Sequence, residues 1–261
     1  MSSLPECGKR YNCFMAPRIA IPMPHSTDVK YGERALPQYA RAVELAGGEP
    51  ITIPLDKTPA EIMKLIERCD GVLLPGSNAD VDPAKYDAPR HPKTDAADPK
   101  RDTVDELLLQ DAYNMRKPVL GICYGLQILN VYRSGTLVQH IESKINHEAG
   151  RTVPIAHAVE VTPGSLLSKI VKPEANKIPA NSSHHQSADA IGDGLKVVAR
   201  CPDDGIIEAV EGTSLDHFVL AVQWHPERSV DDDLNSRAIF KALVEAAAAR
   251  HSELAGEFEA V

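Results

Sequence analysis

The first 122 residues alternate between short apolar runs and amphipathic stretches, and this alternation constrains the fold more than any other feature of the sequence. Strand-like runs occur at 18–22, 50–54, 71–76 and 118–122, and apolar residues recur at helical spacing in 32–48, 59–69 and 101–116. Short apolar strands separated by helices predict parallel β-α-β units, with helices on both faces of one sheet. In such sheets, ligands bind outside the carboxyl ends of the strands.

The second half of the chain has a different pattern. Strand-like segments at 152–161, 195–200, 205–211 and 218–224 follow one another with few helices between them, and a helix is expected over 232–250. These segments predict mostly antiparallel strands added to the first sheet. With no repeat or linker in the sequence, we expect one domain at 18–250, between an N-terminal tail at 1–17 and a C-terminal tail at 251–261.

Charge and composition exclude several classes of protein. The formal charge of -9 over 261 residues predicts a surface that repels nucleic-acid phosphates and anionic lipids, so neither is an expected partner. The N-terminal residues lack the apolar core of a secretion signal, and no run is long and apolar enough to span a membrane. We therefore expect a cytoplasmic protein. The five cysteines show no C-x-x-C spacing, which argues against a disulfide framework and a zinc site.

The segment "GICYG" places Cys123 where a predicted strand turns into a helix. A nucleophile at such a corner needs small neighbours, which Gly121 and Gly125 provide, and the start of the helix favours a thiolate. The backbone N–H of Tyr124 can face a developing oxyanion. The alternative is a small buried residue at a close contact between helix and strand. A partner base would decide between the two.

The strand-like run "FVLAVQW" ends in His225, Pro226 and Glu227. Cysteine chemistry needs an imidazole to move the proton and a third group to hold its tautomer. Pro226 favours an extended His225, and residues two apart on an extended backbone face the same side, so we expect Glu227 to reach the ring of His225.

The other histidines give no comparable signal. His147 lies in "HEAGR", which departs from H-E-x-x-H at its last position. His184 and His185 are adjacent, but no carboxylate or cysteine stands near them at ligand spacing. We therefore predict no metal site and no cofactor.

A segment of about two dozen residues, 78–100, is much longer than the usual β-α loop of roughly 2–6 residues. It lies at the edge where ligands bind, so we expect either a lid or wall of the substrate site or a mobile surface insertion.

Several motifs together resemble a known family. "LGICYGLQILN" and "AVQWHPE" resemble the class I glutamine amidotransferase superfamily. More narrowly, "LLPGSNADVDPAKY", "RDTVDELLLQDA", "GTLVQ" and "NSSHHQ" resemble the γ-glutamyl-γ-aminobutyrate hydrolase branch, peptidase family C26, over residues 18 to 248. The resemblance implies a flavodoxin-like α/β/α sandwich with a mostly parallel central sheet and extra antiparallel strands in the C-terminal half.

The resemblance also implies a reaction and residue roles. It implies hydrolysis of a γ-glutamyl amide, as in polyamine catabolism, through a thioester on Cys123, with His225 as base and acid and Glu227 as its orienter. The oxyanion would lie against the backbone of Gly76, Ser77 and Tyr124. The γ-glutamyl group would contact the remaining implied residues, which are Gln127, His185 and Gln186.

Three functions stay open from the sequence. The first is a free-standing hydrolase of a small γ-glutamyl conjugate, which is favoured because no ATP-binding segment accompanies the elbow. The second is a glutaminase subunit that feeds ammonia to a separate synthetase. The third is a catalytically silent binding protein on the same scaffold. The sequence departs from the branch's pattern at three positions, so the leaving amine stays open. It has "CYG" in place of the frequent Cys-Arg-Gly, Ser77 in place of the second glycine of "PGG", and Ser134-Gly135 in place of the usual Gly-Gly before "TL". A homodimer is compatible with each of the three functions.

Overall fold

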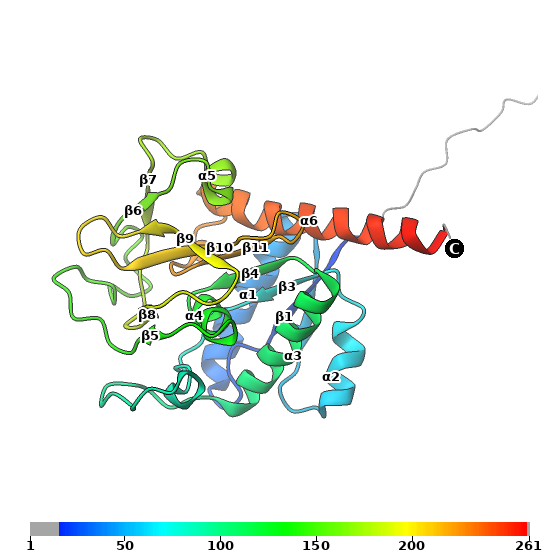
Figure 1. Cartoon of the computed structure of the whole chain (residues 1–261), viewed down its shortest axis with the longest axis horizontal. Helices are drawn as coiled ribbons and strands as arrows, with labels where there is room; N and C mark the ends of the chain where they lie inside the picture. The colour runs from blue at the N-terminus through cyan, green and yellow to red at the C-terminus, as the bar shows by residue number, and fades with distance from the viewer. Residues whose placement is uncertain (1–15, 260–261) are drawn as a thin grey trace, which may run out of the picture.

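The computed structural model describes residues 16–259, with side chains described to Glu253. The predicted tail 1–17, with Cys7 and Cys13, therefore lies almost wholly outside the described residues. A nine-stranded sheet runs through the molecule in the order β2-β1-β3-β4-β11-β10-β9-β6-β7 (Figure 1). The strands β1 to β4 and β11 are parallel, and β10, β9, β6 and β7 continue the sheet antiparallel to their neighbours. The predicted fold class is confirmed.

The parallel half follows the predicted alternation closely. Its elements are β1 (Arg18–Pro22), α1 (Val29–Leu45), β2 (Glu49–Ile53), α2 (Pro59–Ile66), β3 (Gly71–Leu74), the 3-10 helix η1 (Pro83–Tyr86), α3 (Pro99–Met115), β4 (Val119–Ile122) and α4 (Tyr124–Tyr132). Each helix but α4 has a side chain that accepts from the free N–H groups of its first turn. These local signals explain why the elements were visible in the sequence.

The second half contains more elements than its periodicity indicated. They are β5 (Leu137–Val138), β6 (His157–Val161), α5 (Leu166–Val171), β7 (Lys177–Ala180), β8 (Ser187–Ala188), β9 (Leu195–Arg200), β10 (Ile207–Gly212), β11 (Val219–Val222), the 3-10 helix η2 (Pro226–Arg228) and α6 (Leu234–Glu259). A separate two-stranded sheet pairs β5 with β8. Helix α6 continues to Glu259, past residue 250 where the sequence placed the end of the domain.

Two apolar cores lie on the two faces of the sheet. On one face, α1, α5 and α6 pack against it, and on the other, α2, α3 and α4 do (Figure 1). The result is a three-layer sandwich. Because β3, β4 and β11 are neighbouring parallel strands, their carboxyl ends lie at the same edge, with Leu74 beside Gly121 and Ile122 beside Val222. No helix among the described residues is both long and apolar enough to cross a bilayer.

Candidate active site

The corner between β4 and α4 holds Cys123 in a strained backbone conformation, with φ of 54° and ψ of −107°. The flanking glycines allow it. A Cβ on Gly125 would lie 2.1 Å from the carbonyl oxygen of Leu74, and one on Gly121 would lie 2.7 Å from the carbonyl oxygen of Gly125. The prediction that Cys123 needs small neighbours is therefore confirmed. The structure adds a reason, because β3 packs directly against the turn between β4 and α4.

His225 and Glu227 follow β11, the strand next to β4 in the sheet. His225 Nδ1 lies 2.8 Å from Glu227 Oε1, so the ring N–H donates to the carboxylate and Nε2 stays available. Glu227 reaches the ring from the 3-10 turn η2, and not from the extended backbone that we expected, because the chain turns directly after His225. Both side chains are buried.

Electrostatics favour a charged ring at His225. Burial alone would lower the pKa of His225, but the Glu227 carboxylate and the nearby Cys123 thiol outweigh it and raise that pKa to about 9. Burial also acts to raise the pKa of Glu227, yet His225 and Arg228 hold it below its usual range. Cys123 acts on the pKa of His225 both through its charge and through a side-chain hydrogen bond, and the part that the two side chains play in a reaction stays a prediction.

The other described cysteines are unsuited to nucleophilic chemistry. Burial raises the pKa of Cys69 and of Cys201 to about 11, and both are free thiols, as is Cys123. A thiol with a raised pKa carries little thiolate at neutral pH. Of the described cysteines, Cys123 alone lines a cavity at the edge of the sheet where ligands are expected.

That cavity has a volume of about 380 Å³ and a mostly polar lining. It brings together several residues predicted from the sequence, and its lining residues are Ser77, Asn78, Ala79, Asp80, Asp95, Cys123, Gln127, Ser183, His184, His185 and Gln186. Its size suits a small substrate. The long segment 78–100 contributes four of these residues, which makes it a wall of the cavity.

Asp80, in this wall, contacts lining residues of another segment. Its carboxylate accepts from Gln186 Nε2 at 2.9 Å, contacts His185 Nε2 at 3.1 Å and also accepts from the backbone N–H of Asp95. The contact with Asp80 raises the pKa of His185. Gln127, on α4, donates from Nε2 to the carbonyl oxygen of Gln186 at 3.2 Å. The predicted substrate-binding residues therefore share one network.

The three predicted oxyanion donors differ in whether their backbone N–H groups are already hydrogen-bonded. The backbone N–H of Gly76 donates to the Tyr39 hydroxyl at 3.0 Å, so it is engaged, contrary to the expected role. Ser77 lines the cavity, and Tyr124 is the first residue of α4, where backbone N–H groups have no acceptor within the helix. A Cβ on Gly76 would lie 3.1 Å from the His225 ring, so this glycine is needed for close approach.

Two supporting residues were missed by the sequence argument. Asn181 bonds both the carbonyl oxygen and the N–H of His225, at 2.8 and 2.9 Å, and so fixes the backbone that presents the ring. Arg101 is fully buried, donates to the carbonyl oxygen of Pro75 and lies over the ring of Tyr124. Both stand inside quoted motifs, "NSSHHQ" and "RDTVDELLLQDA", but their contacts are long-range and leave no local signal.

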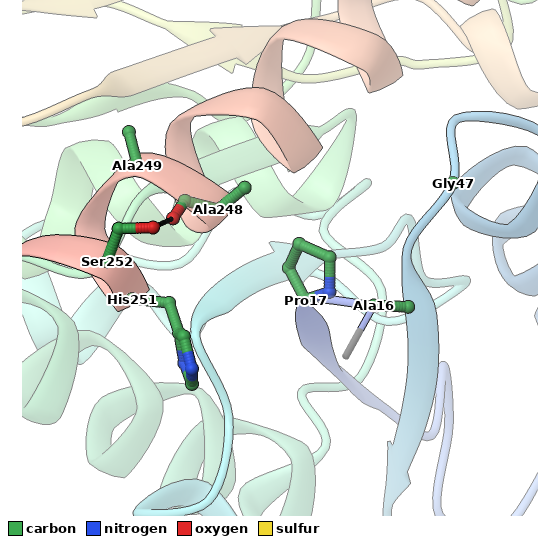
Figure 2. A pocket seen from close by; sticks show the side chains of 7 residues that line it. All are labelled: Ala16, Pro17, Gly47, Ala248, Ala249, His251 and Ser252. Atoms are coloured by element: carbon green, nitrogen blue, oxygen red, sulfur yellow. Dashed lines mark hydrogen bonds between the residues drawn. The ribbon is translucent and has the colours of Figure 1, made fainter. Parts of the chain in front are cut away.

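A second hollow, of about 470 Å³, lies at the opposite edge of the sheet (Figure 2). It is bounded by residues just before β1 and β2 and by the segment 248–252 of α6, and its lining is Ala16, Pro17, Gly47, Ala248, Ala249, His251 and Ser252. His251 is paired with Asp70 at 2.7 Å. We assign no chemistry to this hollow.

Comparisons with known proteins place the chain in a family. Residues 19–227 match the Peptidase C26 family. A Mycobacterium tuberculosis protein provisionally named a glutamine amidotransferase is 39% identical over 213 residues, which cover 80% of this chain and 66% of that protein. The γ-glutamyl-γ-aminobutyrate hydrolase PuuD of Escherichia coli K12 is 34% identical over 220 residues, covering 80% of this chain and 84% of the enzyme.

Among solved structures, one from Thermoplasma acidophilum, provisionally described as a component of GMP synthase, has a similar fold. It has a TM-score of 0.66 and 15% identity, and the match covers 92% of this chain and 98% of that one. At this identity the likeness concerns the fold alone.

Proposed function

The chain belongs to the peptidase C26 family of class I glutamine amidotransferase-like hydrolases, which act on amide bonds, and from this membership we propose that it hydrolyses the γ-glutamyl amide of a small amine through a Cys123 thioester. A γ-glutamyl-γ-aminobutyrate conjugate is the first substrate to test, because the E. coli relative is named for it. The proposal depends mainly on one observation: β4 and β11 are neighbouring parallel strands, Cys123 directly follows β4, and the His225–Glu227 pair follows shortly after β11.

The proposed first step forms the thioester. His225 takes the proton of the Cys123 thiol, and the sulfur attacks the γ-carbonyl carbon. The negative charge that develops on the carbonyl oxygen meets the N–H groups of Ser77 and Tyr124. His225 then gives its proton to the leaving amine, and the carbon–nitrogen bond breaks. Glu227 supports this step because it keeps the ring in one tautomer and stabilises its charged form.

In the second step water releases glutamate. His225 takes a proton from the water, whose oxygen attacks the thioester carbon; the Cys123 thiolate then leaves and takes that proton from His225. No step needs a metal or a cofactor at Cys123. In the proposed pose, Gln127 and the 185–186 segment hold the γ-glutamyl part, and the wall that contains Asp80 faces the amine.

The test is turnover by the purified chain alone. We would offer γ-glutamyl conjugates of γ-aminobutyrate, putrescine derivatives, amino acids and ammonia, and follow glutamate release and the mass of the trapped acyl-enzyme. Release from at least one conjugate with a small amine, with an adduct on Cys123, is expected.

Two results would contradict the proposal. Turnover of glutamine only, and only when a synthetase is added, would identify the glutaminase component of a larger enzyme. A chain that releases no glutamate and forms no adduct from any conjugate would be a binding protein.

A further inference from the structure

A second group of histidines with a carboxylate lies buried beside the cavity and takes no part in the proposed reaction. It consists of His147, His157, His184 and Glu208, which we call the histidine cluster. Their exposed fractions are 3%, 8%, 4% and 0%. One ligand-type atom from each lies within 4.8 Å of the corresponding atoms of the other three. The members come from β6, β10 and two separate loops, so the tertiary fold alone assembles them.

In each imidazole ring of the histidine cluster, one nitrogen forms a hydrogen bond to a group outside the cluster. His147 Nε2 lies 2.9 Å from Asp204 Oδ2. His157 Nδ1 lies 3.2 Å from the carbonyl oxygen of Ala158, and His184 Nδ1 lies 2.9 Å from that of Gln186. A carbonyl oxygen only accepts, so in His157 and His184 the outward nitrogen holds the proton, and the same tautomer fits His147 beside the Asp204 carboxylate. The inward nitrogens are left with a lone pair.

The inward atoms have no hydrogen-bond partner among the described residues. They are His147 Nδ1, His157 Nε2, His184 Nε2 and both carboxylate oxygens of Glu208. A fully buried carboxylate without a donor is costly, because desolvation is not repaid. Metal-binding histidines commonly show this arrangement, with one nitrogen held by a carbonyl or carboxylate and the other directed at the ion.

The distances from Glu208 to the three inward nitrogens resemble those between ligands of a tetrahedral ion. Glu208 Oε1 lies 3.4 Å from His147 Nδ1, 3.4 Å from His157 Nε2 and 3.8 Å from His184 Nε2. Ligands about 2.0–2.1 Å from a tetrahedral zinc ion stand roughly 3.3 Å apart. The observed spacing is too long for good hydrogen bonds and close to that of ligands around one ion.

We propose that the histidine cluster binds a divalent transition-metal ion, with zinc as the reference ion, in a closed site of three imidazoles and one carboxylate. Four protein ligands leave no open position, which is typical of a structural zinc site and not of a catalytic one. A hollow of about 280 Å³ lined by His147 and His184 provides an access route from the surface.

The ion would connect the second half of the sheet to the substrate cavity. His184 donates to the carbonyl oxygen of Gln186, the same atom that accepts from Gln127. The neighbouring Asn181 holds His225. A metal-bound His184 would therefore fix the segment 181–186 against β10, on which Glu208 lies. This consequence for turnover rests on the proposed function, but metal binding does not.

The experiment measures metal directly. The full chain is dialysed against a chelator and titrated with Co²⁺, whose visible absorption reports tetrahedral coordination, and Zn²⁺ is added in competition. We expect one saturable equivalent per chain, displaced by Zn²⁺, and a higher melting temperature in the metal-loaded form. A chain that binds much less than one equivalent, or whose melting temperature is the same with and without Zn²⁺, would overturn the proposal.

Variants locate the bound ion. Glu208→Gln should abolish tetrahedral Co²⁺ binding. Asp204→Asn changes the partner of His147 Nε2, as well as the acceptor of Ser143 and of the Ile206 N–H, and should weaken binding by about 10- to 100-fold. His251→Gln removes an exposed histidine far from the cluster and should leave the stoichiometry and affinity unchanged. Retention of full affinity in Glu208→Gln would contradict the assignment.

Cys123→Ala separates this site from the nucleophile. The variant should bind Co²⁺ as the wild type does, even if it has lost all turnover. Loss of the cobalt spectrum in Cys123→Ala would show that the ion sits at the nucleophile, and the proposal would fall. If Glu208→Gln does not fold, the wild-type titration and the Cys123→Ala spectrum still decide the question.

Discussion

Two buried groups of histidine and glutamate are connected to the segment 181–186, one through Asn181 and the other through His184, and they differ in the hydrogen bonds that their polar atoms make. At the corner near Cys123, the ring of His225 is paired with Glu227, and Cys123 lines an open cavity. In the histidine cluster, the inward atoms lack hydrogen-bond partners among the described residues and converge on one another. Similar side chains therefore serve different ends: a paired group beside a cavity is suited to moving protons, and a converging unpaired group is suited to holding an ion.

The largest expected effect is the loss of turnover when Cys123 is replaced, which separates the two groups. Cys123→Ala should lower kcat by at least about 10⁴-fold, because no thioester can form, while the melting temperature and the metal content stay as in the wild type. Glutamate release and metal analysis of the same sample provide the measurement. Cys69→Ala, which changes a buried thiol away from the cavity, is the matched control. Wild-type activity in Cys123→Ala would refute the assignment.

The next effect concerns the orienter. Glu227→Gln should lower kcat by about 10²- to 10⁴-fold and change KM much less, because the carboxylate acts mainly when the ring is charged. The pKa of His225 should fall from about 9, since burial then acts without the opposing carboxylate. The pH dependence of Cys123 alkylation reports this shift. An unchanged profile would mean that Glu227 does not act on the ring.

A smaller effect is expected within α4. Gln127→Ala should raise KM by about tenfold, because a buried hydrogen bond to Gln186 and the proposed contact with substrate are lost. Asn130 lies on the same helix and is also buried, but it bonds Thr136 and Ala190, away from the cavity. Asn130→Ala should therefore lower the melting temperature and leave KM unchanged. Equal KM values in Gln127→Ala and the wild type would remove Gln127 from the site.

The last effect is on stability. The pKa of His225 is raised from 6.5 to about 9 in the folded chain, so its contribution is fully present below pH 6.5 and is lost as the pH rises through 9. The free energy of unfolding should fall by about 3 kcal/mol over this interval. Denaturant titrations at a series of pH values measure it. Glu227→Gln should show little of this slope, and a wild-type slope in that variant would contradict the cause.

The predictable parts of the molecule are those with local causes. The strands β1, β3 and β4 are continuous apolar runs because both faces of a parallel sheet are covered, and each leaves a signal in its own residues. The strand β7 was missed because it is a short edge strand that contains Pro179. The elements β5, β8 and α5 were missed because they are too short to show a periodic pattern of apolar residues.

The same division holds for the site. Sequence motifs identified Cys123, His225 and Glu227, because each stands at the end of a recognisable strand. The engaged N–H of Gly76 depends on Tyr39, which lies 37 residues away, and no local pattern contains it. The 3-10 turn at Glu227 likewise departs from the extended geometry that the sequence favoured.

The amino-acid sequence by itself determined the alternation of strands and helices, the strained corner at Cys123 and the residue types that this edge of the sheet presents, because these follow from short-range sterics and the burial of apolar side chains. Only the tertiary structure decided which distant polar groups meet. His147, His157, His184 and Glu208 have no common spacing along the chain, and the expectation of no metal site followed from that spacing. Side chains converge in space through the order of strands in the sheet, which sequence separation does not record.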